Sequence, residues 1–155
     1  MSERGKPVPL ARLLLMSYRL LIDGMHQRLR EEGWHDVRPA YGFVLLATRD
    51  RSTTSVELAS LLGVTKQAAS KILDPMDAAG YVRRSVDPED ARVKIVELAP
   101  RGWELLAAVE CIYAELEAEW GAAIGVAAVE LMRKHLTEIV LAANGGEFPA
   151  IRPSP

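Results

Sequence analysis

Residues 55–98 read S-V-E-L-A-S-L-L-G-V-T-K-Q-A-A-S-K-I-L-D-P-M-D-A-A-G-Y-V-R-R-S-V-D-P-E-D-A-R-V-K-I-V-E-L, and this stretch decides the fold. Its apolar spacing predicts two short amphipathic helices that meet at Gly63, because glycine readily takes the positive φ that ends a helix and turns the chain. A strand, an acidic turn and a second strand are predicted to follow. This order is typical of a helix-turn-helix with a β-hairpin wing, an architecture that reads duplex DNA.

The second helix of the pair presents two chemically different faces. Thr65 is expected to be its N-cap, since a threonine hydroxyl accepts a hydrogen bond from a free backbone N–H. The expected buried face recurs at helical spacing and comprises Ala69, Ile72, Leu73 and Met76. The opposite face carries Lys66, Gln67, Ser70 and Lys71, which can bond phosphates and base edges in a major groove. The alternative is an ordinary helix pair with a solvated polar face.

The predicted wing consists of strands over 81–86 and 92–98, which are rich in aromatic and β-branched residues. Residues 87–90, Asp-Pro-Glu-Asp, supply the turn between them. Positive charge lies on or beside the hairpin at Arg83, Arg84, Arg92 and Lys94. Arg92 follows the turn, where an extended guanidinium could enter a minor groove. The alternative interpretation of these arginines is a charged edge that blocks pairing with other sheets.

This stretch resembles the MarR family of bacterial winged-helix regulators, and the resemblance covers about residues 10–143. The matching segments are Leu58-Ala59…Gly63-Val64-Thr65-Lys66-Gln67, Asp74, Gly80-Tyr81-Val82-Arg83-Arg84, Asp87-Pro88-Glu89-Asp90-Ala91-Arg92 and Leu98…Gly102. The resemblance implies a mainly α fold with a small β-hairpin wing, that is, a winged helix-turn-helix with terminal dimerisation helices. It also implies that Arg92 enters the minor groove and that Asp74 helps to orient Arg92.

Two residues depart from the family's pattern. Pro75 lies inside the predicted recognition helix, where it removes a backbone donor and should bend the helix after Asp74. Ala91 stands where the family frequently has a further basic residue, and this change should weaken the hold of the wing on DNA.

The charge of the chain is unevenly distributed. The total net charge is −2 and the pI is about 5.9, whereas many nucleic-acid binders are basic. Residues 51–101 carry eight Lys and Arg against seven Asp and Glu, a net of +1, and the rest carries eleven against fourteen, a net of −3. This asymmetry predicts modest non-specific affinity for DNA and a binding mode that depends on correct placement.

The remaining chain is predicted to be helical over 10–32, 39–49, from Pro100 onward, and 126–143, with Gly121 and Gly125 interrupting the long helix. The first helix carries an apolar stripe at i, i+3 and i+4 spacing, formed by Leu10, Leu13, Leu14, Tyr18, Leu21, Met25 and Leu29.

These terminal helices have more apolar surface than one small reading region can cover. We therefore expect a two-fold homodimer in which residues 10–32 and 100–143 interlock as dimerisation helices. In this organisation residues 1–155 form a single domain, residues 39–98 form the DNA-reading region, and residues 144–155 form a loosely ordered tail. A length of 155 residues is typical of one domain.

The residues that enzymes use are scattered or absent in the sequence. His26, His35 and His135 have no metal-ligand spacing with Cys111 or with one another, and there is no phosphate-binding glycine loop or nucleophile motif. We therefore expect no catalytic activity, no metal and no cofactor. Cys111 has apolar neighbours in a predicted helix, which favours a buried structural thiol over a redox sensor. His26 and His135 are expected to be partly exposed helix residues.

Together these features favour a cytoplasmic transcriptional repressor that binds a palindromic operator in double-stranded DNA as a homodimer. No apolar stretch of about 18 residues predicts a membrane span, and the N-terminus lacks a secretory signal. The expected DNA contacts are Thr65, Lys66, Gln67, Ser70, Lys71 and Arg92. The alternative function is a winged-helix protein–protein interaction module without DNA binding, which Pro75, Ala91 and the acidic pI favour.

A small aromatic or phenolic effector is also expected, in part because many MarR-type regulators bind such ligands between the dimerisation helices and the reading region. Trp34, Tyr41 and Phe43 could stack on a planar ligand, and Arg19 or Arg38 could pair with its carboxylate. The alternative, given equal weight, is that Trp34 and Tyr41 simply plug the junction between helices.

Overall fold

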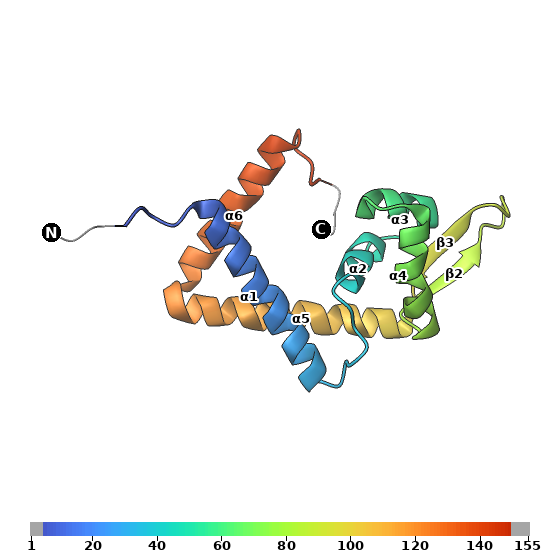
Figure 1. Ribbon diagram of the computed structural model, residues 1–155, viewed down its shortest axis with the longest axis horizontal. Coiled ribbons are helices and arrows are strands. Elements are labelled where there is room, and N and C mark those ends of the chain that lie inside the picture. The colour runs from blue at the N-terminus through green and yellow to red at the C-terminus, as the bar shows by residue number, and fades with distance from the viewer. Residues whose placement is uncertain (1–4, 150–155) are drawn as a thin grey trace.

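The computed structural model describes residues 5–149, which form six helices and a three-stranded sheet. The elements are α1 Leu10–Glu31, α2 Tyr41–Thr48, β1 Thr53–Thr54, α3 Ser55–Leu62, α4 Lys66–Ala78, β2 Val82–Val86, β3 Lys94–Leu98, α5 Pro100–Ile124 and α6 Val126–Ala143. In Figure 1 the helices α2, α3 and α4 and the sheet gather at one end of α5, α1 crosses α5, and α6 turns back from its far end. The mainly helical winged-helix fold predicted from the sequence is confirmed.

The turn between α3 and α4 is encoded by the residues that flank it. Thr54 caps α3 by accepting a hydrogen bond from the backbone N–H of Glu57 at 3.1 Å, and the Glu57 carboxylate accepts one in return from the backbone N–H of Thr54. Gly63 ends α3 in the left-handed conformation, with φ of 66°. Thr65 then caps α4 through the backbone N–H of Ala68 at 3.1 Å, as predicted.

The sheet has the strand order β1-β3-β2, and both pairings are antiparallel. β2 begins one residue later than predicted because Tyr81 still completes the end of α4, donating its backbone N–H to the carbonyl of Met76 at 2.8 Å. β3 begins two residues later than predicted because Arg92 belongs to the turn, where its backbone N–H donates to the Asp90 carboxylate. The two-residue strand β1 was not predicted.

The helix α4 packs its apolar face on the core as expected. Ala69, Leu73 and Met76 are buried, and Ile72 is half-buried. Pro75 does not end the helix, since α4 continues to Ala78 and the Pro75 carbonyl still accepts the backbone N–H of Ala79. The bend expected at this proline stays a prediction.

The prediction that Gly121 interrupts the long helix is wrong. α5 runs without a break to Ile124, and only Gly125, with φ of 99°, separates it from α6. Gly121 is buried inside α5, and a Cβ there would lie 3.3 Å from the side chain of Val126. The glycine therefore allows α6 to fold back closely against α5.

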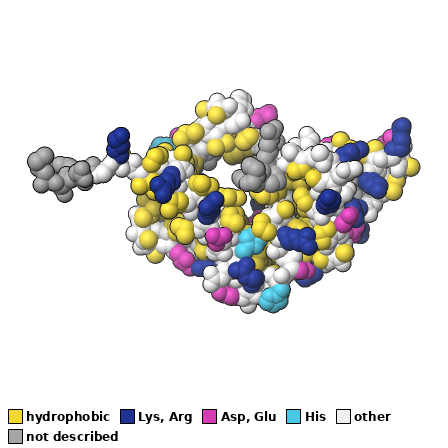
Figure 2. Space-filling view, viewed as in Figure 1, with side chains coloured by type: hydrophobic (Ala, Val, Ile, Leu, Met, Phe, Trp, Pro, Cys, Tyr) yellow, Lys and Arg dark blue, Asp and Glu magenta, His cyan; other side chains and the backbone are white. Residues whose placement is uncertain are grey.

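The terminal helices leave much of their apolar surface exposed, and Figure 2 shows hydrophobic side chains spread over this end of the molecule. The large exposed hydrophobic residues on α1 are Leu10, Leu13, Leu14, Leu15, Met16, Tyr18 and Leu20. Those on α6 are Val126, Leu131, Met132, Leu136 and Ile139. Residues 144–149 follow α6 without a further helix or strand, and the rest of the predicted tail, 150–155, lies outside the described residues.

Candidate functional site

The outer face of α4 carries the polar side chains that the sequence singled out. Lys66, Gln67, Ser70 and Lys71 are all exposed on the first two turns. Neither lysine forms an ion pair with any residue in the described range 5–149, so both charges are available to an anion. The oxygen of Thr65 accepts the capping bond, which leaves its hydroxyl hydrogen able to donate. This surface combines cations with donors and acceptors at a helix N-terminus.

Arg92 lies in the turn of the wing and is almost fully exposed, with 91% of its side chain accessible. Its Nε lies 3.1 Å from Oδ1 of Asp90, and its backbone N–H donates to the same oxygen. These hydrogen bonds, first the one from the side chain, lower the pKa of the Asp90 carboxyl below its usual range. Asp90 therefore orients a guanidinium that projects from the tip of the protein.

The prediction that Asp74 orients Arg92 is corrected by the observed contacts. The carboxylate of Asp74 lies 2.7 Å from Arg84, whose Nε in turn lies 2.9 Å from the carboxylate of Asp77. The physical reason is that Arg84 lies in the middle of β2, next to α4, whereas Arg92 lies in the turn between β2 and β3. Arg84 therefore connects the wing to the recognition helix.

The aromatic residues proposed for an effector are packed into the junction behind α4. The ring centroids of Trp34 and Tyr41 lie 6.2 and 5.9 Å from that of Tyr81, and the Arg101 guanidinium lies 4.5 Å from the Tyr81 ring. The Tyr81 hydroxyl donates to Asp36 at 2.5 Å. Burial and this hydrogen bond raise the pKa of Tyr81, and the bond lowers the pKa of Asp36. The alternative of a plugged junction matches this geometry.

A cavity of about 480 Å³ lies elsewhere, between α1, α2 and α5. None of Arg19, Trp34, Arg38 and Tyr41 lines it, because the two aromatic residues pack on Tyr81 and the two arginines are exposed at the surface. Phe43 does line it. The apolar side chains around the cavity include Ile22, Met25, Phe43, Leu45, Leu46 and Val109. Apart from Phe43, the residues expected from the sequence to contact an effector are therefore not the ones that line this cavity.

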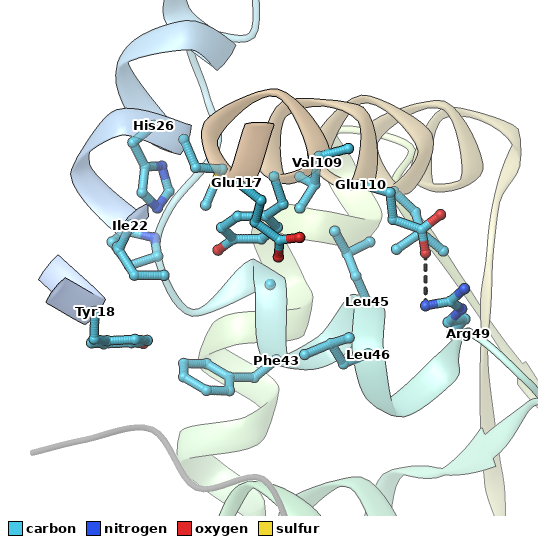
Figure 3. Close-up of a pocket in the computed structure, with 16 residues that line it drawn as sticks. Tyr18, Ile22, His26, Phe43, Leu45, Leu46, Arg49, Val109, Glu110 and Glu117 are labelled. Carbon is cyan, nitrogen blue, oxygen red and sulfur yellow. Dashed lines mark ion pairs between the residues drawn. The ribbon is translucent and has the colours of Figure 1, made fainter. Parts of the chain in front are cut away.

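The three charged side chains that line this cavity, Arg49, Glu110 and Glu117, each form an ion pair. Arg49 lies 2.7 Å from the carboxylate of Glu110, and Glu117 pairs with Arg133 of α6. The Nε2 atom of His26 is buried and has no hydrogen-bond partner among the described residues. Burial, followed by the neighbouring charge of Arg30, lowers the pKa of His26. Figure 3 shows His26 and the Arg49–Glu110 pair on opposite sides of the cavity.

One face of α1 carries a sequence signal for this cavity. Tyr18, Ile22 and His26 are spaced four residues apart and therefore share one face of α1. On this face the imidazole of His26 follows the largely apolar side chains of Tyr18 and Ile22, and this combination indicates a binding surface. The contributions of α2 and α5 depend on how the helices pack, and no local pattern indicates them.

The prediction of a buried thiol at Cys111 is wrong. Cys111 is exposed on α5, with Sγ 3.8 Å from a carboxylate oxygen of Glu115, while its neighbour Ile112 is the buried residue. His26 is half-buried and His135 is exposed, which is close to the expectation for both.

Across residues 5–149 no group of three or more His, Cys, Asp or Glu side chains could hold a metal ion. Within the same residues, no helix is both long and apolar enough to cross a membrane.

Comparison with known proteins gives a consistent result. The MarR family model matches residues 35–93. The reduced form of MarR from E. coli is 25% identical over 88% of this chain and 99% of that chain, with a TM-score of 0.74. BldR from Sulfolobus solfataricus is 29% identical over 84% of this chain and 91% of its own, with a TM-score of 0.62.

A mutant of S. aureus MepR, solved with a bound oligodeoxyribonucleotide, is 22% identical, with a TM-score of 0.61 over 88% of this chain and 99% of that one. No curated protein matches this chain in sequence.

A capped helix pair, an exposed polar helix face and a hairpin with a projecting arginine define a winged helix-turn-helix protein. The family model and the solved structures narrow this class further. Residues 35–93 match the MarR family model, and the fold is similar to that of MarR from E. coli and of the transcriptional regulator BldR over more than four fifths of this chain.

Proposed function

We propose that this protein is a repressor that binds a palindromic operator as a homodimer. In this proposal residues 39–98 read the DNA: Gln67, Ser70 and Lys71 contact bases in the major groove, Thr65 and Lys66 contact phosphates, and Arg92 enters the minor groove. Residues 10–32 and 100–143 hold the two copies together, so that two recognition helices lie about one DNA turn apart.

The observation that carries the proposal is that α4 and the wing both present exposed cationic side chains. Lys66 and Lys71 are free of ion pairs within the described residues, and Arg92 projects from the wing. Arg84 fixes the spacing between the recognition helix and the wing through Asp74 and Asp77. The oligonucleotide bound to the S. aureus MepR mutant lends support by analogy.

Replacing Arg92 with Ala tests the wing. Operator affinity, measured on a site selected from a random DNA pool, should fall about tenfold to a hundredfold, while the melting temperature stays unchanged. The matched control is Arg83→Ala, which removes the same charge from β2 but leaves the tip intact, and should cost less than about threefold. Equal losses for both variants would mean that Arg92 contributes only bulk charge.

A salt titration separates DNA reading from the alternative of a protein–protein module. Specific binding through several phosphate contacts should weaken steeply as salt rises. Binding that is absent at low salt for every sequence in the pool would favour the protein-interaction module instead.

We further propose that a small aromatic ligand in the cavity between α1, α2 and α5 releases the repressor from DNA. The cavity joins the terminal helices to the reading region, so a ligand there can favour one relative placement over another. Release requires that the ligand bind one form of the dimer more tightly than the form that binds DNA. In the ligand-preferred form, the spacing of the two recognition helices does not match the operator.

A ligand panel of phenols, benzoates and salicylates, scored for thermal stabilisation and for loss of operator binding, tests this proposal. An effector should score in both assays. Replacing Leu46, which lines the cavity and is half-exposed, with Trp would fill the cavity and should abolish both effects while operator binding persists. If no compound scores in both assays, the effector part of the proposal is wrong.

A further inference from the structure

Arg101 occupies a position that its own helix does not favour. It lies in the first turn of α5, where the positive end of the helix dipole disfavours a cation, and that turn contains no acidic residue. Its side chain is half-exposed, yet the guanidinium folds back over two aromatic rings, with Cζ 4.5 Å from the ring centroid of Tyr81 and 5.7 Å from that of Trp34. The polar contacts that hold Arg101 there come from other elements.

One of these contacts is made at the end of the recognition helix. Nη1 of Arg101 donates a hydrogen bond at 2.8 Å to the carbonyl of Ala79, which follows α4 as its C-cap. The end of a helix has unpaired carbonyls and a partial negative charge, and the last turn of α4 contains no basic residue of its own. Arg101 therefore caps α4 with a cation that α5 supplies.

The other contact joins Arg101 to the segment that follows α1. Its guanidinium pairs with the Asp36 carboxylate at 3.3 Å, and the Tyr81 hydroxyl donates to the same carboxylate. Trp34 in this segment is held at the end of α1, because its backbone N–H donates to the carbonyl of Leu29 at 2.8 Å. Trp34, Asp36, Tyr81 and Arg101 form the Arg101 cluster, which connects α1, α4 and α5.

The Arg101 cluster lies where the reading region meets the terminal helices. Figure 1 shows α4 and the sheet at the first turns of α5, while α1 and α6 pack along the rest of this helix. The backbone N–H of Ala99 donates to the Tyr81 carbonyl at 3.0 Å, and this bond holds the start of α5 without any help from the Arg101 side chain. The side chain adds a link to Ala79, and so restrains the direction of α4 relative to α5.

We propose that Arg101 is a positioning residue for operator recognition, which fixes the angle of α4 against α5 and thereby the distance at which a dimer reads two half-sites. This inference rests on the proposed function, because it requires that two copies bind one palindrome. Such a dimer prefers one half-site spacing only while each recognition helix keeps a fixed angle to the helices that join the copies. A less restrained α4 should fit other spacings, at some loss of affinity for the best one.

The experiment measures the affinity of the full-length protein for an operator selected from a random DNA pool and for derivatives with the half-sites moved by one or two base pairs. One base pair turns the half-sites by about 35° relative to each other, so the parent should lose about tenfold or more. Arg101→Met removes the charge but keeps an unbranched apolar side chain over the rings. Its loss should shrink to about threefold or less, while its affinity for an isolated half-site stays within about twofold of the parent value.

Three further variants separate positioning from charge. Arg101→Lys keeps a cation near the Ala79 carbonyl and should retain most of the spacing preference. The matched control is Arg51→Met, which removes an exposed arginine that forms no ion pair within residues 5–149 and should lower every affinity by the same factor, less than about threefold. Asp36→Asn removes the acidic partner of Arg101 and should weaken the spacing preference to an intermediate degree; combined with Arg101→Met it should add nothing further.

The outcomes separate this inference from the function on which it rests. If the parent binds no palindrome or has no spacing preference, the proposed dimeric reading of DNA is wrong and the inference falls with it. If the parent prefers one spacing and Arg101→Met prefers it as strongly, only the inference is wrong. Equal losses for Arg101→Met on the half-site and on every operator would reduce Arg101 to bulk charge and also overturn the inference.

Melting curves establish that each variant is folded. If Arg101→Met does not fold, Asp36→Asn decides the question, because its half-exposed carboxylate can be replaced by an amide of the same shape. A weakened spacing preference in Asp36→Asn supports the positioning role, and an unchanged one overturns it.

Discussion

The reading region and the terminal helices bury their apolar side chains to very different degrees. Leu58, Leu73 and Val96 in the reading region are at most 1% exposed, whereas Leu10 of α1 and Ile139 of α6 are 68% and 62% exposed. The reading region thus completes its core within one chain. The terminal helices have apolar faces that only another molecule can cover, and this difference supports the proposed homodimer.

The starts of the helices set α3 and α4 apart from the rest. Each of these two helices begins after a threonine whose side chain caps the first turn. α1, α5 and α6 begin after Pro9, Ala99 and Gly125, and neither they nor α2 of the reading region has a side-chain cap. The helix pair α3 and α4 is therefore fixed by its own sequence, and the other helices depend more on packing.

The largest expected effect comes from making the terminal helices unable to pair. The double variant Leu14→Glu with Ile139→Glu places charges on both exposed faces and should give a monomer by light scattering. Operator affinity should fall about a hundredfold or more, because the two half-sites are no longer bound together. The control is Val56→Glu, an exposed apolar residue of α3, which should leave the oligomeric state unchanged. A stable parent monomer that recognises a palindrome would contradict the dimer.

A smaller effect, on the free energy of unfolding, is expected where the reading region meets the terminal helix α5. Gly102 in the first turn of α5 has no room for a side chain, since a Cβ there would lie 2.0 Å from the Tyr81 carbonyl oxygen. Gly102→Ala should therefore lower the free energy of unfolding by about 2–3 kcal/mol in denaturant titrations. Gly42→Ala in α2 is the matched control, since a Cβ there meets nothing within 4 Å and should be neutral or slightly stabilising. Equal stabilities for the two variants would mean that α5 can shift away from Tyr81.

The smallest expected effect concerns acid stability at the same junction. The pKa of Asp36 in the folded protein is lowered from 3.8 by the hydrogen bond from Tyr81 and by Arg101, so the unfolded chain takes up a proton first as the pH falls. The contribution of Asp36 to stability is present above about pH 4 and is lost as the pH falls below it. Between pH 6 and pH 3 the parent should therefore lose more stability than Asp36→Asn, by less than about 1 kcal/mol because the carboxylate is half-exposed.

The control for this pH dependence is Asp50→Asn, which changes an exposed aspartate that forms no ion pair within residues 5–149. Its stability should follow that of the parent through the same pH range. If the stability of the parent and that of the Asp36→Asn variant fall by the same amount between pH 6 and pH 3, Asp36 has no role in acid stability.

The sequence predicted the reading region well because its signals are local. Gly63 and Thr65 specify the turn through their own backbone and hydroxyl groups, and the apolar positions of α4 repeat at the helical period. The two-residue strand β1 escaped prediction because its pairing with β3 involves residues about 40 positions away, and a pair of threonines gives no periodic signal.

The contacts within the candidate site are harder to predict because they join residues from different elements. The family resemblance predicts that Asp74 contacts Arg92, yet the register of β2 brings Arg84 to it instead. Trp34 and Tyr41 were assigned to a ligand, yet the end of α4 brings Tyr81 against both rings. In each case the residue types were suited to the expected chemistry, and tertiary packing chose another partner.

The continuity of α5 has a mechanical consequence. This helix of 25 residues begins two residues after β3 ends, contacts the wing at its first turn, and continues to the proposed subunit interface without a break. At a rise of about 1.5 Å per residue it is a lever roughly 37 Å long, so a tilt of about 5° at the far end displaces the wing by about 3 Å. That displacement is comparable to the length of a hydrogen bond. A small adjustment between two subunits would thus be enough to take Arg92 out of reach of a groove.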